Sequence, residues 1–431
     1  DTCPLDCLHS SCGDGKCASA ETPTSCAADC AAYHSPALGP HHACAARFDG
    51  TVWCWGFNGH GQLGVGDTLS RTSPVRVSGL GPVSNVYASQ ISSTCALDTG
   101  GQLWCWGINT YGALGAGSYN TFWSNPLKVK NMRDVASASP HCAVTTGGKL
   151  YCWGNNTYGQ LGNGTTDGDR HVTPEQVDAL GSNAAQVASS YRYNCAIKTD
   201  GTLWCWGYNS AGQLGDGVTD HGSICWGFDC SPNPVQVTTL GTEVAQVAVS
   251  ELNSCAIKTD ATLWCWGGNG SGQLGDGTTT RRLLPVQATA LGTGGVSAVA
   301  LGGYHTCALK GDGTLWCWGS HFYSELGDGT TNNSITPIQV TALGTNATEV
   351  SAGYRDTCAI ADGVMRCWGE NNNAQMGIDI ASPAQTTPVQ PITCGDNICD
   401  FAERSRNTCP EDCTTPCGDC VCDPFLEDET S

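Results

Sequence analysis

Short runs in which apolar and polar residues alternate recur along the chain, and this pattern predicts β-strands. In the segment 195–205, two such runs flank Asp200-Gly201. An Asp-Gly pair between alternating runs is a strong signal for a β-hairpin, because tight turns need residues that accept a positive φ. No window approaches the run of about eighteen apolar residues that a transmembrane helix needs. We therefore predict an all-β protein built from hairpins, with no membrane span.

The turn length fixes which residues face each other in the hairpin. If residues 199–201 form a three-residue loop with the glycine in the left-handed conformation, the cysteines that bound the segment lie directly opposite each other. The last hairpin is one residue shorter, and a two-residue turn at 362–363 again places its cysteines opposite each other. Directly opposite residues come close enough for a disulfide bond. The predicted pairs are Cys44–Cys54, Cys95–Cys105, Cys142–Cys152, Cys195–Cys205, Cys255–Cys265, Cys307–Cys317 and Cys358–Cys367.

Each hairpin belongs to a larger repeat. The motif Trp-Cys-Trp-Gly occurs in seven copies, with Tyr151 and Arg366 in place of the first Trp in the third and seventh copies. The distance between copies ranges from 47 residues (Cys95 to Cys142) to 60 residues (Cys195 to Cys255). A repeat of roughly fifty residues with several short strands is typical of a β-propeller blade. The predicted fold is a seven-bladed β-propeller with one disulfide within each blade.

Two further repeated residue types are interpreted as structural. Trp204 and Trp206 share one face of their strand, so we expect the paired indoles to lie between neighbouring blades; an exposed aromatic platform for sugars is the alternative. An Asn also recurs two residues after the Gly of the motif, and an Asx-type turn explains it better than chemistry repeated six times. These positions are Asn58, Asn109, Asn156, Asn209, Asn269 and Asn371, with His321 in the sixth copy.

Composition narrows the cellular setting and the partners. The 431 residues include 29 Cys, and 39 acidic against 19 basic side chains give a formal net charge of −20. An acidic chain repels the phosphate backbone, so we expect no nucleic-acid partner. Many regularly paired cysteines are natural in an oxidising compartment, which predicts an extracellular protein, secreted or on a cell-surface appendage. No Ser-His-Asp set or isolated carboxylate pair stands out from the repeats, so we do not predict an enzyme.

Over residues 31–392 the chain resembles the family named for the regulator of chromosome condensation. The resemblance rests on the repeated Pro-Val-x-Val stretch, the segment before the first Cys, and Trp-Gly-x-Asn-x-x-Gly-Gln-Leu-Gly. It implies a seven-bladed propeller whose first and last segments close the ring. The nuclear member's nucleotide exchange on a small GTPase and its docking on chromatin do not transfer to an acidic, cysteine-rich chain. A bacterial member inhibits β-lactamase through its loop face, which implies that a protein-binding role is open.

Small cysteine-rich modules are predicted on both sides of the propeller, at 1–30 and 393–416. Their cysteine spacings are nearly the same, 5, 9 and 4 against 5, 10 and 4 residues, and modules this short need two disulfides to hold a fold. Carboxylates recur in register with the cysteines, which makes Ca²⁺ a possible cofactor. The alternative is a solvated acidic loop. The candidate calcium ligands are Asp14, Glu21, Asp29, Asp396, Glu403 and Asp412.

The two ends of the chain each match half of such a module. Residues 1–7 match the closing half, and residues 417–431 match the opening half. One chain could therefore complete the module of the next, and heterologous contacts of this kind build open fibres. A fragment cut from a longer tandem array is the alternative. The odd number of cysteines leaves at least one without a partner inside one chain, and the candidates for bonds between subunits are Cys3, Cys7, Cys417, Cys420 and Cys422.

The fourth copy carries the longest insertion, residues 218–233, in which Cys225 and Cys230 bracket Trp226 and Phe228. A stapled loop that exposes two aromatic residues is either a recognition tip or a contact with a neighbouring subunit. Two functions follow from the sequence. The favoured one is an extracellular structural protein whose copies link head to tail into a filament or surface polymer. The alternative is a secreted, inhibitor-like or adhesin-like propeller that binds a cell-surface protein or a glycan through its loop face.

Overall fold

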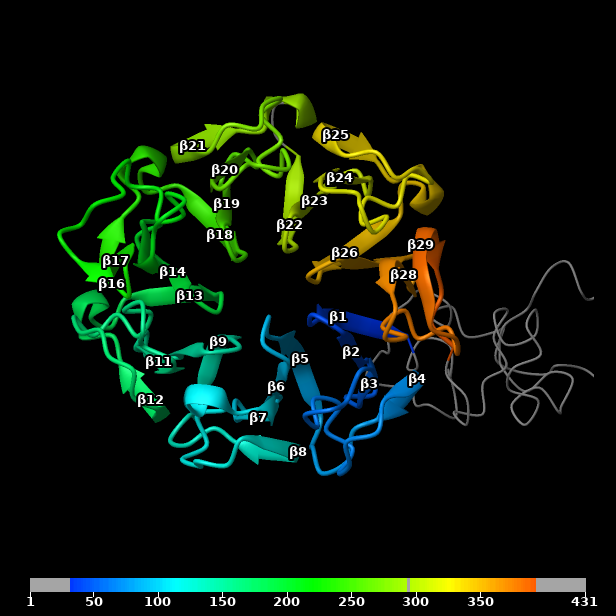
Figure 1. Cartoon of the computed structure of the whole chain (residues 1–431), viewed down its shortest axis with the longest axis horizontal. Coiled ribbons are helices and arrows are strands. Elements are labelled where there is room, and N and C mark those ends of the chain that lie inside the picture. The colour runs from blue at the N-terminus through cyan, green and yellow to red at the C-terminus, as the bar shows by residue number, and fades with distance from the viewer. Residues whose placement is uncertain (1–31, 293–294, 393–431) are drawn as a thin grey trace, which may run out of the picture.

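Seven antiparallel β-sheets are arranged as a ring around a central axis (Figure 1). The computed structural model describes residues 32–292 and 295–392. The first strand of each sheet lies next to the axis, and the later strands follow outward in chain order. Blade 4 has one extra short strand at its edge. The predicted all-β fold with seven blades is confirmed.

The strand bounds show that each blade is formed by consecutive segments. Blade 1 contains β1 (Tyr33–Leu38), β2 (His42–Arg47), β3 (Val52–Gly56) and β4 (Arg71–Arg76); blade 2 contains β5 (Val83–Ala88), β6 (Ser93–Asp98), β7 (Leu103–Ile108) and β8 (Phe122–Lys128); blade 3 contains β9 (Val135–Ser139), β10 (Cys142–Thr145), β11 (Leu150–Gly154) and β12 (His171–Gln176); blade 4 contains β13 (Ala184–Ser189), β14 (Tyr193–Lys198), β15 (Leu203–Tyr208), β16 (Ile224–Cys225) and β17 (Phe228–Gln236). Blade 5 contains β18 (Val244–Val249), β19 (Asn253–Lys258), β20 (Leu263–Gly267) and β21 (Arg282–Gln287); blade 6 contains β22 (Val296–Leu301), β23 (His305–Lys310), β24 (Leu315–Gly319) and β25 (Ser334–Gln339); blade 7 contains β26 (Ala347–Ala352), β27 (Asp356–Ala361), β28 (Val364–Asn371) and β29 (Ser382–Val389). Short 3-10 turns are η2 (Thr110–Gly112), η3 (Asp178–Leu180), η4 (Thr238–Leu240), η5 (Thr289–Leu291) and η6 (Thr341–Leu343).

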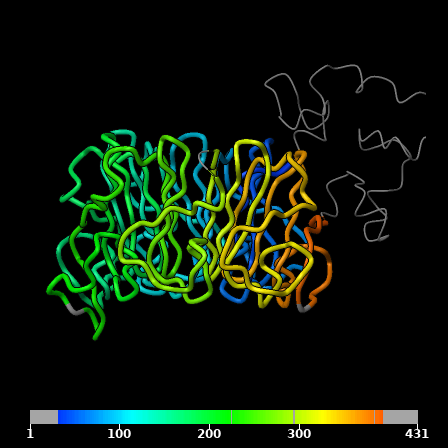
Figure 2. The backbone as a smooth tube through the Cα atoms, turned by 90° about the horizontal axis from the view of Figure 1, so that it is seen from above, coloured from blue at the N-terminus to red at the C-terminus, as the bar shows by residue number. Residues whose placement is uncertain are grey.

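The ring has two faces, visible edge-on in Figure 2. Because neighbouring strands are antiparallel, the loops between first and second strands emerge on the same face as the loops between third and fourth strands. We call this the loop face. The hairpins between second and third strands and the connections between blades emerge on the opposite face, which we call the hairpin face.

The predicted hairpin register is confirmed in every blade. In blade 4, the Lys198 amide donates to the Thr202 carbonyl oxygen at 2.9 Å, and Gly201 has a φ of +78°. Cys195 is then the direct partner of Cys205, with a Cα–Cα distance of 4.1 Å. In blade 7 the turn has two residues and the same pairing results. All seven predicted blade disulfides are present, and so is the Cys225–Cys230 pair in the insertion.

The paired indoles lie between neighbouring blades, as predicted. Trp206 is fully buried against the Cys142–Cys152 disulfide of blade 3, and its indole N–H donates to the Gln160 carbonyl oxygen at 2.9 Å. The first indole of the pair, Trp204, is partly buried against the same cluster. Each blade therefore packs the second Trp of its motif against the disulfide of the preceding blade.

The ring closes by the same contact. Trp55 of blade 1 packs in one cluster with Cys358 and Cys367 of blade 7, and its indole N–H donates to the Gln375 carbonyl oxygen at 2.8 Å. All strands of blade 1 precede residue 77, and all strands of blade 7 follow residue 346. Within the described ranges, no blade combines strands from both ends of the propeller. Side-chain packing and a few hydrogen bonds therefore close the ring.

The recurrent Asn has a structural role, as predicted, but its hydrogen bonds reach further along the chain than those of an Asx turn. The side-chain oxygen of Asn209 accepts from the Leu214 amide, five residues on, at 3.0 Å, and its side-chain nitrogen donates to the Val218 carbonyl oxygen at 2.6 Å. In blade 6, the Nδ1 atom of His321 accepts from the Leu326 amide at 2.9 Å in the same way. This residue organises the loop between the third and fourth strands, which lies on the loop face.

The end modules lie outside the described residues. This applies to the module boundaries, to all six candidate calcium ligands and to the five candidate intersubunit cysteines. Those assignments stay predictions. Between residues 32 and 392, leaving out 293–294, no cluster of three His, Cys, Asp or Glu side chains is arranged to hold a metal ion. No helix in the same ranges has the length and apolar character to cross a membrane.

Candidate protein-interaction face

Aromatic side chains other than the structural tryptophans are concentrated on the loop face. Among the described residues, the hairpins, blade connections and adjoining strand ends of the hairpin face contain two such side chains, Tyr33 and Phe48. The loops and adjoining strand ends of the loop face contain Phe57, Tyr111, Tyr119, Phe122, Tyr158, Tyr191, Tyr193, Tyr208, Trp226, Phe228, Tyr304, Phe322, Tyr323 and Tyr354. Aromatic residues are enriched in protein interfaces, so the two faces differ in their capacity for binding.

One group of these rings surrounds Arg192 at the junction of blades 3 and 4. The guanidinium carbon of Arg192 lies 5.8 Å from the ring centre of Tyr158 and 5.4 Å from that of Tyr208. The two tyrosine rings meet edge to face at 5.2 Å, and the ring centre of Phe228 lies 5.6 Å from that of Tyr208. We call this group, together with Tyr191, the Arg192 site. It combines cation–π contacts with apolar ring surface.

The strand geometry of blade 4 fixes the position of the Arg192 site. Gly207 follows the second Trp of the motif and has a φ of +107°, and a Cβ there would lie only 2.6 Å from the Arg192 carbonyl oxygen. A glycine therefore lets the loop that carries Arg192 lie directly on the third strand. The next residue, Tyr208, is thereby placed next to Arg192 in the Arg192 site.

The insertion of blade 4 forms a stapled hairpin beside this site. β16 pairs with the start of β17, and Trp226 and Gly227 form the turn with φ values of +54° and +85°. Trp226 is 75% exposed and Phe228 is 46% exposed. The disulfide between Cys225 and Cys230 closes the hairpin. The structure thus presents the two aromatic residues as the sequence predicted, and a bulky residue with positive φ at an exposed tip is uncommon.

A second group of rings surrounds Arg355 at the junction of blades 6 and 7. The guanidinium carbon of Arg355 lies 4.2 Å from the ring centre of Tyr323 and 5.2 Å from that of Tyr354. Its Nη1 atom lies 3.7 Å from Oε2 of Glu370. The ring of Tyr354 meets that of Tyr304 at 5.8 Å. We call these five residues the Arg355 site. The Tyr-Arg pair occupies the same place in its repeat as Tyr191-Arg192.

Buried acidic groups make the surroundings of Arg355 unusual. Burial raises the pKa of Glu325 to about 7, and burial together with the nearby Glu370 raises the pKa of Asp356 well above its usual value. The hydrogen bond with Tyr304, followed by burial, raises the pKa of Tyr354 to about 12. The positions equivalent to these acids around Arg192 hold Gln160, Tyr193 and Tyr208, and Arg192 makes no ion pair within the described ranges.

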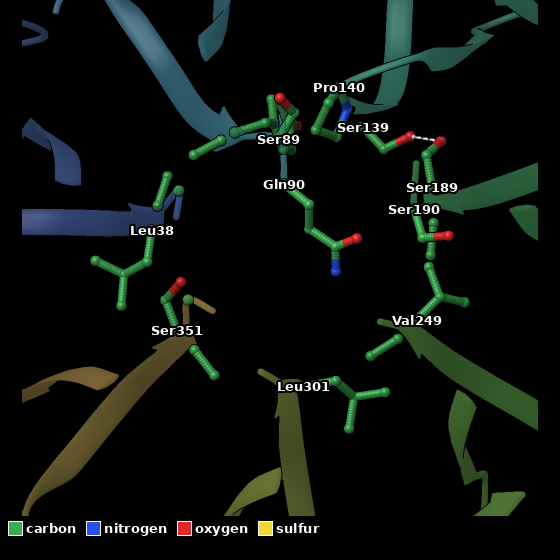
Figure 3. Close-up of a pocket in the computed structure, with 18 of the residues that line it drawn as sticks. Leu38, Ser89, Gln90, Ser139, Pro140, Ser189, Ser190, Val249, Leu301 and Ser351 are labelled. Carbon is green, nitrogen blue, oxygen red and sulfur yellow. Dashed lines mark hydrogen bonds between the residues drawn. The ribbon is translucent and has the colours of Figure 1, made fainter. Parts of the chain in front are cut away.

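The cavity in the central channel differs from the two arginine sites in the residues that line it. A cavity of about 310 Å³ lies on the ring axis, and Figure 3 shows side chains such as Leu38, Gln90, Ser189, Val249 and Leu301 pointing into it. No Asp, Glu, Lys or Arg is among the residues that line it. The channel walls are mostly small and apolar, and they include His141, whose pKa burial lowers to about 4.

Sequence reasoning identified the Trp226 hairpin and missed both arginine sites. Tyr158 and Arg192 are 34 residues apart, and Tyr323 and Arg355 are 32 apart, so no local pattern joins them. A signal was present: the dipeptide Tyr-Arg occurs three and four residues before the first blade cysteine in two of the seven copies. Both times, a tyrosine occupies the same position in the third-to-fourth-strand loop of the preceding blade.

The geometry defines a disulfide-stapled propeller with one aromatic loop face, and comparison with known families agrees with it. The family model of the RCC1-like domain matches residues 94–402, and that of the regulator of chromosome condensation (RCC1) repeat matches residues 49–96. The chain belongs to the RCC1-like domain family.

Individual relatives extend the comparison. The chain is 30% identical to the ultraviolet-B receptor UVR8 of Arabidopsis thaliana over 79% of this chain and 77% of the receptor. It is 29% identical to the human E3 ubiquitin-protein ligase HERC2 over 73% of this chain, but it spans only 7% of that ligase. Among solved structures, Prp20p from Saccharomyces cerevisiae matches with a TM-score of 0.68 and 21% identity, covering 79% of this chain and 85% of Prp20p. The last similarity shows the fold alone.

Proposed function

We propose that the protein is a secreted binding module that captures a protein partner through its loop face, with the Trp226 hairpin and the Arg192 site as the centre of contact. The observation that carries this proposal is the uneven distribution of aromatic residues between the two faces. A largely exposed Trp beside a Tyr-Arg group is the composition typical of interaction hot spots. A cell-surface glycan is the second ligand class that stacked aromatic rings accept.

Two further observations support a binding role. Prp20p, which shares the propeller fold, binds Gsp1p and histones, so a propeller of this shape serves as a protein-binding platform in that case. The blade disulfides are buried and repeated, and such bonds persist in oxidising compartments, which supports a location outside the cell. The filament prediction depends on the end modules, outside the described residues, and is not needed for binding at the loop face.

The function is tested by affinity capture with the full chain as bait. The bait is incubated with culture medium and cell-surface extract of the source organism, and bound proteins are identified by mass spectrometry. The double variant Trp226→Ala/Phe228→Ala removes the exposed rings, and Phe48→Ala on the hairpin face is the matched control, because Phe48 is 40% exposed. We expect the double variant to weaken capture at least about tenfold, since hot-spot truncations exceed about 2 kcal/mol, with Phe48→Ala unchanged.

Two results would contradict the proposal. If every captured protein binds the double variant as well as the natural chain, the Trp226 hairpin is not the contact. If a glycan array shows ring-dependent binding and no protein partner depends on Trp226, the glycan alternative replaces the protein partner. Equal melting temperatures for the three chains establish that the loss is local.

A further inference from the structure

The loop between the first and second strands, here called the first loop, is much shorter in blade 3 than in the other blades. In five blades, six residues separate the blade cysteine from its partner on the first strand, and in blade 2 there are seven. In blade 3, Ser139 pairs with Cys142, and only Pro140 and His141 lie between them. The inner wall of the ring is therefore lower at blade 3 on the loop face.

The shortened loop removes a hydrogen bond that joins neighbouring blades elsewhere. In three blades, the residue two before the blade cysteine bonds to the residue just before the cysteine of the next blade. The pairs are His42–Thr94 at 2.9 Å, Tyr193–Ser254 at 2.9 Å and His305–Thr357 at 2.8 Å. Blade 3 has Pro140 at this position, and proline has no side-chain donor. Blade 3 therefore cannot make this bond to blade 4.

Two buried polar side chains lack partners at this place. Asn194, 2% exposed, donates through Nδ2 to the Gln160 carbonyl oxygen at 2.6 Å, but its Oδ1 atom has no hydrogen-bond partner among the described residues. The Nε2 atom of His141, which is 9% exposed, has none there either. Burial lowers the pKa of His141 to about 4, so its ring is neutral near pH 7. Unpaired buried polar atoms are unfavourable, and a bound polar group would satisfy both.

Both side chains line a small cavity, which we call the blade 3 notch. The residues that line it include His141, Trp153, Gln160, Ser190, Tyr191 and Asn194. Its volume of about 10 Å³ accommodates one group the size of a water molecule. His141, Ser190 and Tyr191 also line the central cavity of about 310 Å³, so the two spaces adjoin each other. The notch is thus a polar side pocket of the channel.

The channel provides apolar surface next to the notch. Leu38, Val249 and Leu301 extend into it from three different blades (Figure 3). Gln90, from the longest first loop, points towards the centre of the channel, and its Oε1 atom has no hydrogen-bond partner among the described residues. Apolar walls with a few polar groups are typical of small-molecule sites. No Asp, Glu, Lys or Arg lines either cavity, so a charged ligand group would lack an opposite charge.

We propose that the central channel binds a small uncharged molecule with an apolar body, and that a hydroxyl group of this molecule enters the blade 3 notch. A hydroxyl group matches the size of the notch. It donates to Oδ1 of Asn194 and accepts from Nε2 of His141 when that nitrogen carries the proton. The first strands of all seven blades surround the channel, which suits a free small molecule (Figure 1). Capture of a protein partner through Trp226 is not needed for this binding.

The experiment titrates the full chain with benzyl alcohol and follows binding by saturation-transfer NMR. Toluene, which lacks the hydroxyl group, is the matched ligand control. Asn194→Ala removes the unpaired oxygen and installs the residue of blade 1 at this position, Ala43, so the repeat accommodates it. Ser254→Ala makes the equivalent change in blade 5. Ser351→Leu fills the channel from blade 7, across the channel from Ser139 (Figure 3).

We expect the natural chain to bind benzyl alcohol at least about fivefold more tightly than toluene, as one added hydrogen bond predicts. Asn194→Ala should abolish this preference, and Ser254→Ala should keep it. Ser351→Leu should weaken both probes at least about fivefold by filling the space that their rings occupy. Equal melting temperatures establish that these losses are local.

Three results would overturn the proposal: no saturation of either probe, equal affinity of the natural chain for both, or an unchanged preference in Asn194→Ala. The double variant Trp226→Ala/Phe228→Ala should bind benzyl alcohol as the natural chain does, and loss of the signal in this variant would place the probe on the hairpin and not in the channel. Because protein capture is measured separately, failure of the probe leaves the proposed function standing, and failure of capture leaves the channel site standing.

Discussion

The Arg192 and Arg355 sites occupy equivalent positions in the repeat, three blades apart, yet differ in charge. In both, an arginine of the first loop stacks on a tyrosine from the preceding blade. Around Arg192 the neighbouring positions hold Gln160, Tyr193 and Tyr208, all uncharged. Around Arg355 the same positions hold Glu325, Asp356 and Glu370. The propeller thus fixes where these side chains lie, while the residue types at three positions of the repeat set the charge of each site.

The largest expected effect comes from opening a disulfide of the propeller scaffold. Replacing Cys195 and Cys205 by Ala opens the blade 4 disulfide, and loop-closure entropy predicts a loss of about 2.5 kcal/mol in the free energy of unfolding. The double variant is compared with the natural chain by guanidinium denaturation. A loss below about 1 kcal/mol would contradict the idea that the blade bonds carry the scaffold.

The second effect concerns the buried acid of the Arg355 site. Asp356 has a folded-state pKa above its unfolded value of about 3.8, so ionisation disfavours the folded state, and stability falls as the pH rises from about 4 through the folded pKa. Asp356→Asn should therefore be more stable than the natural chain at pH 8, by about 1–2 kcal/mol, and this advantage should vanish near pH 4. Thermal melts across this range measure the difference.

As a control, replacing an exposed acid on the hairpin face should change the pH dependence of stability in the opposite direction. Hydrogen bonds from Thr262 lower the pKa of Asp260. Asp260→Asn should therefore lose stability at neutral pH and match the natural chain only at acid pH. The same sign for both variants would show that net charge, and not burial, governs the response.

The smallest effect compares the two arginines directly. Arg355→Gln removes the cation next to Glu370, so it should lower stability by about 1 kcal/mol at pH 8 and by less at pH 5, where Glu325, whose pKa burial raises to about 7, is protonated. Arg192→Gln removes only ring stacking and should lower stability by about 0.5 kcal/mol at both pH values. Melting curves of the two variants at both pH values test this. Identical pH responses would remove the electrostatic distinction between the sites.

The sequence predicted the fold closely because local rules set it. The spacing of Cys195 and Cys205 around an Asp-Gly turn allowed one register, and the alternation of Trp204 and Trp206 with Cys205 assigned their faces. The candidate site was harder to predict. Stacking of Arg192 on Tyr158 depends on how one blade lies against the next, and the acidic character of the Arg355 site depends on burial, which no short segment encodes.

The closure of the ring through Trp55 and the blade 7 disulfide has a consequence for how the propeller tolerates rearrangement. Since every blade is a complete run of consecutive strands, cutting the chain in any blade connection leaves all seven hairpins and their disulfides intact. The junction between the first and last blades is then equivalent to the other six. The fold is thus suited to circular permutation, in which a different blade comes first in the chain while the order of blades around the axis is unchanged.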